Sequence, residues 1–409
     1  MIEAAHPVLL HSKRIGTLLQ RGDVARFVFA EGYWEDSNRN VLGLAFENNP
    51  RSSPQAALRL PPWFSNLLPE GRLREFIAHD QGVKVTRELQ LLLRIGHDLP
   101  GAVEVLPAAS DEYFDPDVLS KATAAAAAAA IQAEGSPWKF SLAGVGLKMS
   151  LLKQGDRLTI PATNSVGDWI AKFPDAVYPQ VPANELATMQ LARCVGIEVP
   201  EIALVHRDEL PDMPPVVWPN GETYAFTIAR FDRGPDKKRI HIEDFAQVRG
   251  FYDSRKYEGK FETVAALAYR NRDLPALHEF VRRLTFNLLV GNGDSHLKNW
   301  SLIYPNGRIP TLSPAYDLVS TGPYASAHAP DDFGLAFGGT KLPDRIRRRD
   351  FQNLQRKLDV ASADVIDIVD ETLEAFSASW KDGARETFPP FIARWIDTHL
   401  PIVQRQLSQ

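Results

Sequence analysis

An aspartate and an asparagine five residues apart form the strongest chemical signal in this sequence. Asp294 and Asn299 lie in the segment 291–300 (GNGDSHLKNW), directly after an apolar stretch, Phe280–Val290, that we expect to be helical. The spacing is typical of a phosphoryl-transfer loop, in which the aspartate accepts a proton from the acceptor hydroxyl and the asparagine binds Mg²⁺. We therefore predict that Asp294 is a catalytic base and that Asn299 is a metal ligand.

A second carboxylate follows at Asp317. The residues between, 300–304 and 309–313, are predicted to form a hairpin around the turn sequence PNGR. This hairpin brings Asp317 to the place where protein kinases hold a metal-binding aspartate, so we expect it to bridge Mg²⁺ to the phosphates of ATP. Asp294 or Asn299 alone would be explained by a simple loop, in which Asp and Asn are common, but the series of Asp, Asn, hairpin and Asp favours chemistry.

Two further side chains of the same loop are candidates for a catalytic role. His296 either positions the loop or hydrogen-bonds its backbone, and the second, structural role is favoured. Lys298 either contacts the γ-phosphate or extends into solvent. The sequence does not separate these two alternatives for Lys298.

Upstream, the segment 141–148 (SLAGVGLK) has the small residues that let backbone N–H groups approach a phosphate. Lys172 follows within a short alternating strand, Asp168–Phe173, as the phosphate-pairing lysine of kinases does. Glu185, on the next predicted helix, either forms an ion pair with Lys172 or is an ordinary acidic residue of a helix N-terminus.

The elements around these residues predict four consecutive regions: a small mixed unit (1–107), an Ala-rich connector (108–134), a β-rich ATP-binding lobe (135–230) and a mainly helical catalytic lobe (231–409). The elements expected in them are strands at Val24–Ala30, Val41–Phe46 and Ala102–Leu106, helices at Arg72–His79, Arg87–Ile95, Leu119–Ala133 and Asn184–Val195, a hairpin at Phe140–Leu152, and strands at Leu158–Pro161 and Glu222–Ile228.

Composition is that of a globular protein, with 44% apolar and 24% charged residues among 409. The net charge of −5 argues against a surface built throughout to neutralise phosphates. The single cysteine, Cys194, excludes intramolecular disulfides and Cys-rich zinc sites. No signal-peptide pattern begins the chain, and the run Ala124–Ala130 is too short to span a bilayer, so we expect a cytoplasmic protein without membrane contact.

Five motifs, in order, resemble the HipA-type bacterial toxin kinases over nearly the whole chain. They are the segments 64–71 (FSNLLPEG), 141–144 (SLAG), 230–233 (RFDR), 294–299 (DSHLKN) and 314–317 (PAYD). The resemblance implies an α+β fold, with a two-lobed kinase-like architecture, an additional N-terminal subdomain and an α-helical C-terminal lobe. The residues then predicted to bind ATP are Ser141, Leu142, Ala143, Gly144, Val145, Gly146, Lys148, Lys172 and Phe231.

The same resemblance implies a function, namely the toxin of a type II toxin–antitoxin system that uses ATP and Mg²⁺ to phosphorylate a serine of an aminoacyl-tRNA synthetase. The partner implied is a HipB-like helix-turn-helix antitoxin, through which the complex contacts operator DNA. Ser141 matches the loop serine that such kinases autophosphorylate, and Ser150 is the weaker alternative. Two departures, Gly146 where the family usually has Gln and Ala229 where it usually has Glu, bear on ATP affinity but not on phosphoryl transfer.

Two other functions remain compatible with the sequence. One is a small-molecule phosphotransferase, which shares the Asp, Asn and Asp arrangement. The other is a weakly catalytic co-repressor, which would bind a helix-turn-helix partner and would not need that arrangement. The basic clusters 236–239 and 345–349 are consistent with nucleic-acid contact, although solvated charge is the commoner explanation for such runs. The segment 64–71 and Ser141 favour the protein kinase, and the intact acidic residues argue against the co-repressor.

Overall fold

The computed structural model describes residues 4–408, apart from residues 81, 97, 109–147, 156, 160, 162–165, 212, 214 and 326–331. The predicted helix Leu119–Ala133 and the predicted phosphate-binding residues 141–146 therefore lie outside the described residues.

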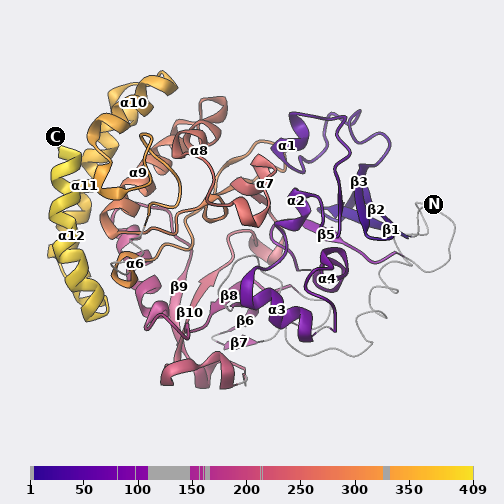
Figure 1. Cartoon of the computed structure of the whole chain (residues 1–409), viewed down its shortest axis with the longest axis horizontal. Helices are drawn as coiled ribbons and strands as arrows, with labels where there is room; N and C mark the ends of the chain where they lie inside the picture. Colours follow the sequence, from indigo (N-terminus) through magenta and orange to yellow (C-terminus); the bar gives the residue numbers. More distant parts are fainter. Residues whose placement is uncertain are drawn as a thin grey trace.

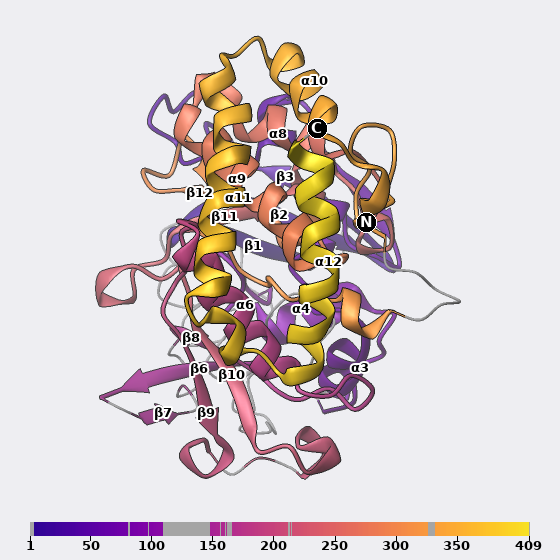
Figure 2. The same cartoon turned by 90° about the vertical axis from the view of Figure 1, so that its left-hand side faces the viewer.

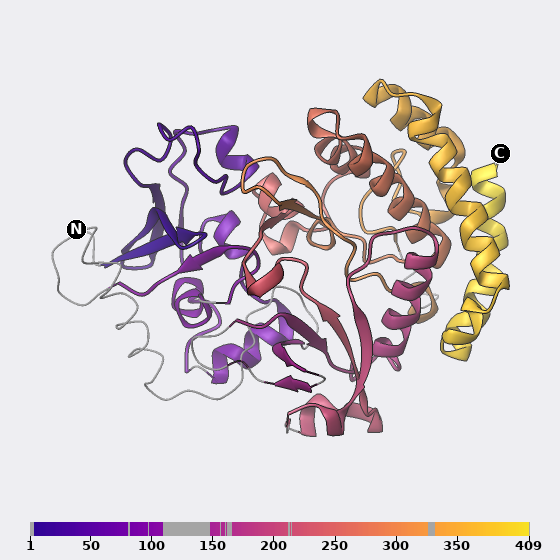
Figure 3. The same ribbon diagram turned by 180° about the vertical axis from the view of Figure 1, so that it is seen from behind.

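The first part of the chain folds around an antiparallel sheet with the strand order β4-β3-β2-β1-β5. Its strands are β1 (Ala4–Leu10), β2 (Lys13–Arg21), β3 (Val24–Phe29), β4 (Gln55–Ala57) and β5 (Val103–Val105). β1 and β2 are joined by His11 and Ser12, both with positive φ, the conformation of a tight two-residue hairpin. Figures 1 and 3 show this unit at the opposite end of the molecule from the C-terminal helices.

Short helices cover this sheet: α1 (Leu44–Glu47), α2 (Pro62–Ser65), α3 (Gly71–Asp80) and α4 (Glu88–Ile95). The last two confirm the predictions at 72–79 and 87–95, and β3 and β5 confirm two of the predicted strands. The predicted strand Val41–Phe46 is wrong, because Leu44 begins α1. The backbone N–H of Leu44 donates to Glu243, which lies 199 residues away in the sequence, so a distant contact fixes the local conformation.

A second antiparallel sheet has the order β7-β6-β8-β10-β9. Its strands are β6 (Lys148–Gln154), β7 (Arg157–Thr159), β8 (Trp169–Lys172), β9 (Ile202–His206) and β10 (Tyr224–Ala229). One helix, α6 (Val181–Cys194), connects β8 to β9 and packs against β9 and β10. The described hairpin joins β6 to β7 around Gly155. The glycines of the hairpin predicted within 140–152 lie outside the described residues, and the described part of that segment belongs to β6.

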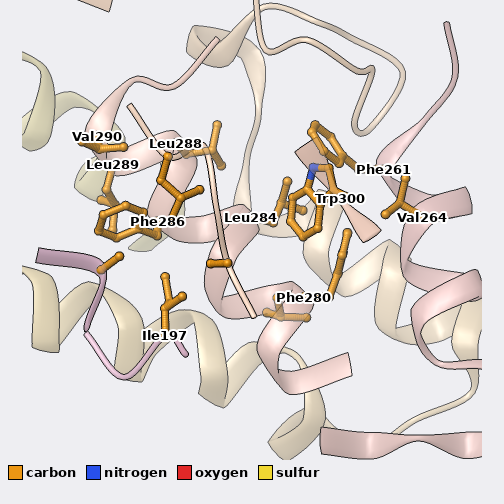
Figure 4. Close-up of a cluster of buried hydrophobic side chains, with 14 of the residues drawn as sticks. Ile197, Phe261, Val264, Phe280, Leu284, Phe286, Leu288, Leu289, Val290 and Trp300 are labelled. Carbon is orange, nitrogen blue, oxygen red and sulfur yellow. The ribbon is translucent and has the colours of Figure 1, made fainter. Parts of the chain in front are cut away.

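The remainder is mostly helical and is centred on α9 (Leu274–Val290). This helix is buried on nearly every side, between α8 (Phe261–Ala268), α11 (Ile366–Lys381) and α12 (Pro390–Ser408), and α10 (Arg348–Leu358) packs on the last two. Figure 2 shows α11 and α12 running side by side over this region. Phe280, Leu284, Phe286 and Trp300 form part of its apolar core (Figure 4).

A small sheet, β11-β12-β13, frames the predicted catalytic loop. It comprises β11 (His241–Asp244), β12 (Ser301–Tyr304) and β13 (Thr311–Leu312), and a one-turn helix, α7 (Phe245–Arg249), follows β11. The pairing of β12 with β13 confirms the hairpin predicted after Asn299. Across the described residues, no helix combines the length and the apolar character that crossing a bilayer requires.

Candidate active site

A cavity of about 940 Å³ collects residues from all three regions of the chain. Its lining includes Lys148 and Lys172 from the second sheet, Glu185 from α6, and Asp294 and Asp317 from the catalytic region. The sequence separates these side chains by as many as 169 positions. The fold therefore places every described residue of the predicted phosphoryl-transfer set around one space.

Lys172 is the centre of a partly buried charge cluster. Its Nζ lies 2.5 Å from Oε1 of Glu185 and 2.6 Å from Oδ1 of Asp317. Burial alone would lower the pKa of Lys172, but the carboxylates of Asp317 and Glu185 raise it above its ordinary value. Of the two alternatives predicted for Glu185, the structure therefore has the ion pair that orients Lys172. Lys172 also contacts the carboxylate of Asp317.

Lys148 places a second ammonium group beside Lys172. The two residues are direct partners across β6 and β8, so their side chains leave the same face of the sheet. Desolvation lowers the pKa of Lys148 to about 8, and it forms no ion pair with another described residue. A cavity that holds an uncompensated lysine next to an ion-paired one is suited to a polyanion such as the phosphates of ATP.

The catalytic loop is held by hydrogen bonds within itself and to α9. Ser295 Oγ accepts from Asn287 Nδ2 at 3.1 Å and from Trp300 Nε1 at 3.0 Å. Asn292 Oδ1 accepts from the backbone N–H of Asp294 at 3.1 Å. The carboxylate of Asp294 is left 45% exposed and lines the cavity, which is the accessibility that a base needs to meet an incoming hydroxyl group.

Asn299 and Asp317 offer the oxygen ligands that Mg²⁺ prefers. Asn299 Nδ2 donates to the carbonyl oxygen of Asp294 at 2.8 Å, which turns the amide oxygen to the other side of the group. Burial opposes ionisation of Asp317, but Lys172 and Lys148 hold its pKa well below the ordinary value, so it is a carboxylate at neutral pH. No group of three His, Cys, Asp or Glu side chains in the described residues could hold a metal. The oxygens of Asn299 and Asp317 suit an ion whose other ligands are phosphate oxygens and water.

Two segments of the chain match models of known protein families. Residues 6–106 match the HipA N-terminal domain, and residues 140–380 match the HipA-like C-terminal domain. The chain belongs to the HipA family. Y4dM of Sinorhizobium fredii, which is named only as a candidate kinase, is 41% identical over 97% of this chain and 96% of its own length.

Two further similarities concern HipA of Shewanella oneidensis, which is named a serine/threonine-protein kinase toxin. It is 27% identical over 88% of this chain and 90% of its own length. Its solved structure, in a complex with HipB and operator DNA, superimposes with a TM-score of 0.73 and 22% identity, covering 98% of this chain and 97% of that one. The predicted two-lobed, HipA-like α+β fold is thereby confirmed.

In this HipA-family chain, Lys298 is not solvated. Its Nζ lies 3.0 Å from Oε1 of Glu70 and donates to the carbonyl oxygen of Asn66 at 3.0 Å. Both partners belong to the N-terminal unit, 228 and 232 residues away in the sequence. Lys298 therefore joins the catalytic loop to that unit, and Lys148 and Lys172 are better placed for phosphate.

The remaining predicted residues take varied positions. Phe231 lines the cavity with its ring 5.5 Å from that of Tyr316. His296 is buried, which lowers its pKa, and its Nε2 lies 3.7 Å from Asp294. Ser150 is fully buried and donates to Asp98 at 2.8 Å, so its hydroxyl does not face the cavity. Ala229 lines the cavity, but its backbone N–H donates to Glu201 at 2.8 Å.

Sequence reasoning missed three side chains of the site. Tyr257 donates a hydrogen bond to Asp294, and Glu70 forms ion pairs with both Lys298 and Lys256. Glu70 lies within the segment 64–71 that carries the family resemblance, which was its only signal. Tyr257 and Lys256 lie in a loop 37 or more residues before Asp294, and nothing in their local pattern indicates the contact.

Proposed function

We propose that the chain is an ATP- and Mg²⁺-dependent protein serine/threonine kinase and the toxin of a type II toxin–antitoxin system. The observation that carries the proposal is the shared cavity, in which the Lys172–Glu185–Asp317 cluster faces the exposed base Asp294. Membership of the HipA family supports it, since related proteins are named kinases. The division into an N-terminal subdomain, a connector and two lobes at 1–107, 108–134, 135–230 and 231–409 is part of the same proposal.

Each residue has a part in the proposed reaction. Asp294 accepts the proton of the serine or threonine hydroxyl as that oxygen attacks phosphorus. Lys172 and Lys148 bind phosphate oxygens, and Asn299 and Asp317 would hold the metal. Mg·ATP supplies the transferable phosphoryl group and its charge neutralisation when bound. Catalysis of this kind depends on alignment and charge more than on covalent chemistry by the protein.

The partners we propose follow from the family. A HipB-like helix-turn-helix antitoxin is supported by the Shewanella structure, which contains HipA with HipB and operator DNA. Contact with operator DNA is then mainly through the antitoxin. An aminoacyl-tRNA synthetase is the proposed protein substrate, and this rests on the family resemblance of the motifs alone.

The test is transfer of label from γ-labelled ATP, with Mg²⁺, to proteins of a bacterial lysate. Asp294→Asn should reduce transfer by roughly 10²–10⁴-fold, the scale of a general base, while leaving folding and nucleotide binding intact. Near-normal transfer by a folded Asp294→Asn variant would show that another group is the base. Label that enters only low-molecular-weight compounds would instead indicate a small-molecule phosphotransferase.

We also propose that Ser141 is autophosphorylated and that this lowers activity. A phosphate there adds about −1.5 to −2 charges, which would repel the ATP phosphates. Ser150, the alternative acceptor, is fully buried against Asp98 and Arg230. Mass spectrometry after incubation with Mg·ATP should find phosphate on Ser141, and Ser141→Ala should prevent inhibition. Phosphate on Ser150 alone, or on neither serine of an active enzyme, contradicts the assignment.

A further inference from the structure

The hydroxyl of Tyr257 occupies a position that the proposed reaction needs for another group. It donates to Asp294 Oδ1 at 2.5 Å. A serine or threonine acceptor must make the same contact, with its hydroxyl within about 2.6–3.2 Å of the base. The phenol and an acceptor hydroxyl therefore compete for one carboxylate.

The backbone of Tyr257 is fixed to the catalytic loop and to a neighbouring segment. The carbonyl oxygen of Lys256 accepts from the backbone N–H of Leu297 at 3.0 Å. The carbonyl oxygen of Tyr257 itself accepts from Lys341 Nζ at 2.9 Å. Only rotation of the side chain can take the phenol away from Asp294.

The side chain is free to make that rotation. Tyr257 is 40% exposed, and its ring meets that of His296 edge-on with centroids 4.9 Å apart. Lys256 and Lys341 place their Nζ atoms 5.4 and 5.9 Å from the ring centroid. These contacts are individually weak, so an incoming protein surface can displace the ring.

The protonation state agrees with a donor role. Burial and the charge of Asp294 raise the pKa of Tyr257 above its ordinary value, so the phenol keeps its proton at neutral pH. Tyr257 is also not one of the residues that line the cavity.

We propose that Tyr257 is a gate over the acceptor site. Its phenol holds the place of the acceptor hydroxyl on Asp294 Oδ1, keeps water from that oxygen, and is displaced when a protein substrate presents serine or threonine. The inference rests on the proposed kinase function, with Asp294 as the base. Exclusion of water before the acceptor arrives would limit wasteful hydrolysis of ATP.

The test is phosphate release from Mg·ATP without any protein acceptor, so that water is the acceptor. Tyr257→Ala should raise this hydrolysis about tenfold, which is below the roughly 10²–10⁴-fold that a general base supplies. The KM for ATP should stay unchanged. Tyr257→Phe keeps the ring against His296 but cannot donate, and it should give a smaller rise. Adding Asp294→Asn to Tyr257→Ala should abolish the gain.

Several outcomes would overturn the gate. Hydrolysis by both Tyr257 variants at or below the rate of the unaltered chain, with ATP affinity retained in calorimetry, would make Tyr257 a positioning residue for Asp294. Phosphate found on Tyr257 by mass spectrometry would make it an acceptor. If the unaltered chain itself does not bind Mg·ATP, the result is different, because the proposed function and the gate are then refuted together. Tyr257→Phe, the less disruptive change, decides the matter if Tyr257→Ala does not fold.

Discussion

Asp317 has a backbone conformation that few residue types adopt readily. Its φ of 59° lies in the left-handed region, which costs a non-glycine residue roughly 1–2 kcal/mol. Aspartate and asparagine tolerate this region better than most residues because their short polar side chains bond locally. Strain of this kind is retained mainly at functional positions, and here it carries the carboxylate that meets Lys172.

Replacing this carboxylate tests the metal role. Asp317→Asn keeps the shape and the tolerance of positive φ, so folding should be preserved. The affinity for Mg·ATP should fall about tenfold or more, equivalent to about 1.4 kcal/mol, because a charged oxygen ligand is lost. The affinity for ATP without metal should change less, because no metal ligand is lost in that case and Lys172, without its acidic neighbour, still attracts the phosphates. Calorimetric titrations with and without Mg²⁺ make the comparison, and an equal loss in both would exclude Asp317 as a ligand.

The end of helix α9 shows how an element sets up the catalytic loop. Gly291 terminates the helix in a left-handed conformation, with φ 66°, and its N–H caps the carbonyl groups of Asn287 and Leu288. Its own carbonyl oxygen accepts from the backbone N–H groups of Thr321 and Gly322. The helix end is thereby tied to the segment that follows Asp317.

Two glycine substitutions separate conformation from packing at this point. A Cβ on Gly291 would lie 2.3 Å from the Trp395 ring, whereas a Cβ on Gly250, the left-handed cap of α7, would meet nothing within 4 Å. Both alanine variants should lose about 1 kcal/mol to the backbone conformation. Gly291→Ala should lose roughly 1–3 kcal/mol more through overpacking, and it should also slow phosphoryl transfer. Urea unfolding of both variants measures the difference, and equal losses would mean that Trp395 moves aside.

Local sequence patterns predicted the elements whose own residues decide their structure. The helix ending at Val290, the hairpin after Asn299 and the strand that carries Lys172 are all confirmed. The predicted strand at Val41–Phe46 failed because the contact to Glu243 decides it. The helix predicted at Asn184–Val195 is confirmed as part of α6, but its buried face is not set by apolar side chains alone, since Asn184 and Thr188 are buried while Cys194 is exposed.

The same division holds for the site. Asp294, Asn299 and Asp317 are found from spacing because they lie within one short stretch of chain. Lys172 could be predicted from the alternating pattern of its strand and from the glycine-containing segment 141–148 upstream. Glu70 and Tyr257 reach the loop through the tertiary fold, from 228 and 37 residues away, so no local pattern shows the contacts that they make there. Contacts between distant segments are the part that a single sequence did not disclose.

Across the whole molecule, buried polar contacts fasten the N-terminal unit to the rest of the chain. Asp98 pairs with Arg230 at 2.8 Å and with Arg233 at 3.0 Å, beside the Phe231 that lines the cavity. Glu243 accepts from the backbone of Leu44 and from the indole of Trp63 at 3.2 Å. Because removing one partner of a buried pair costs about 3–5 kcal/mol, the N-terminal unit is an integral support of the catalytic region.

Glu70 allows this support to be measured as a function of pH. Its carboxylate is buried, but Lys298 and Lys256 outweigh the burial and lower its pKa from 4.5 to about 2. A carboxyl group whose pKa is lower in the folded chain than in the unfolded chain stabilises the folded state fully at a pH above its pKa in the unfolded chain. The stabilisation is then lost as the pH falls from about 4.5 toward 2.

Glu70→Gln should therefore lower the free energy of unfolding by on the order of 3 kcal/mol at pH 7. The difference from the unaltered chain should be constant above about pH 4.5 and shrink as the pH falls further, because both lysines remain charged in that range. Glu75→Gln is the matched control, since Glu75 lies on α3, the helix that begins directly after Glu70, is exposed and has no ion pair to a described residue. Urea unfolding between pH 7 and 3 gives both curves. A difference that does not change with pH would mean that Glu70 supports the catalytic loop through packing rather than through its charge.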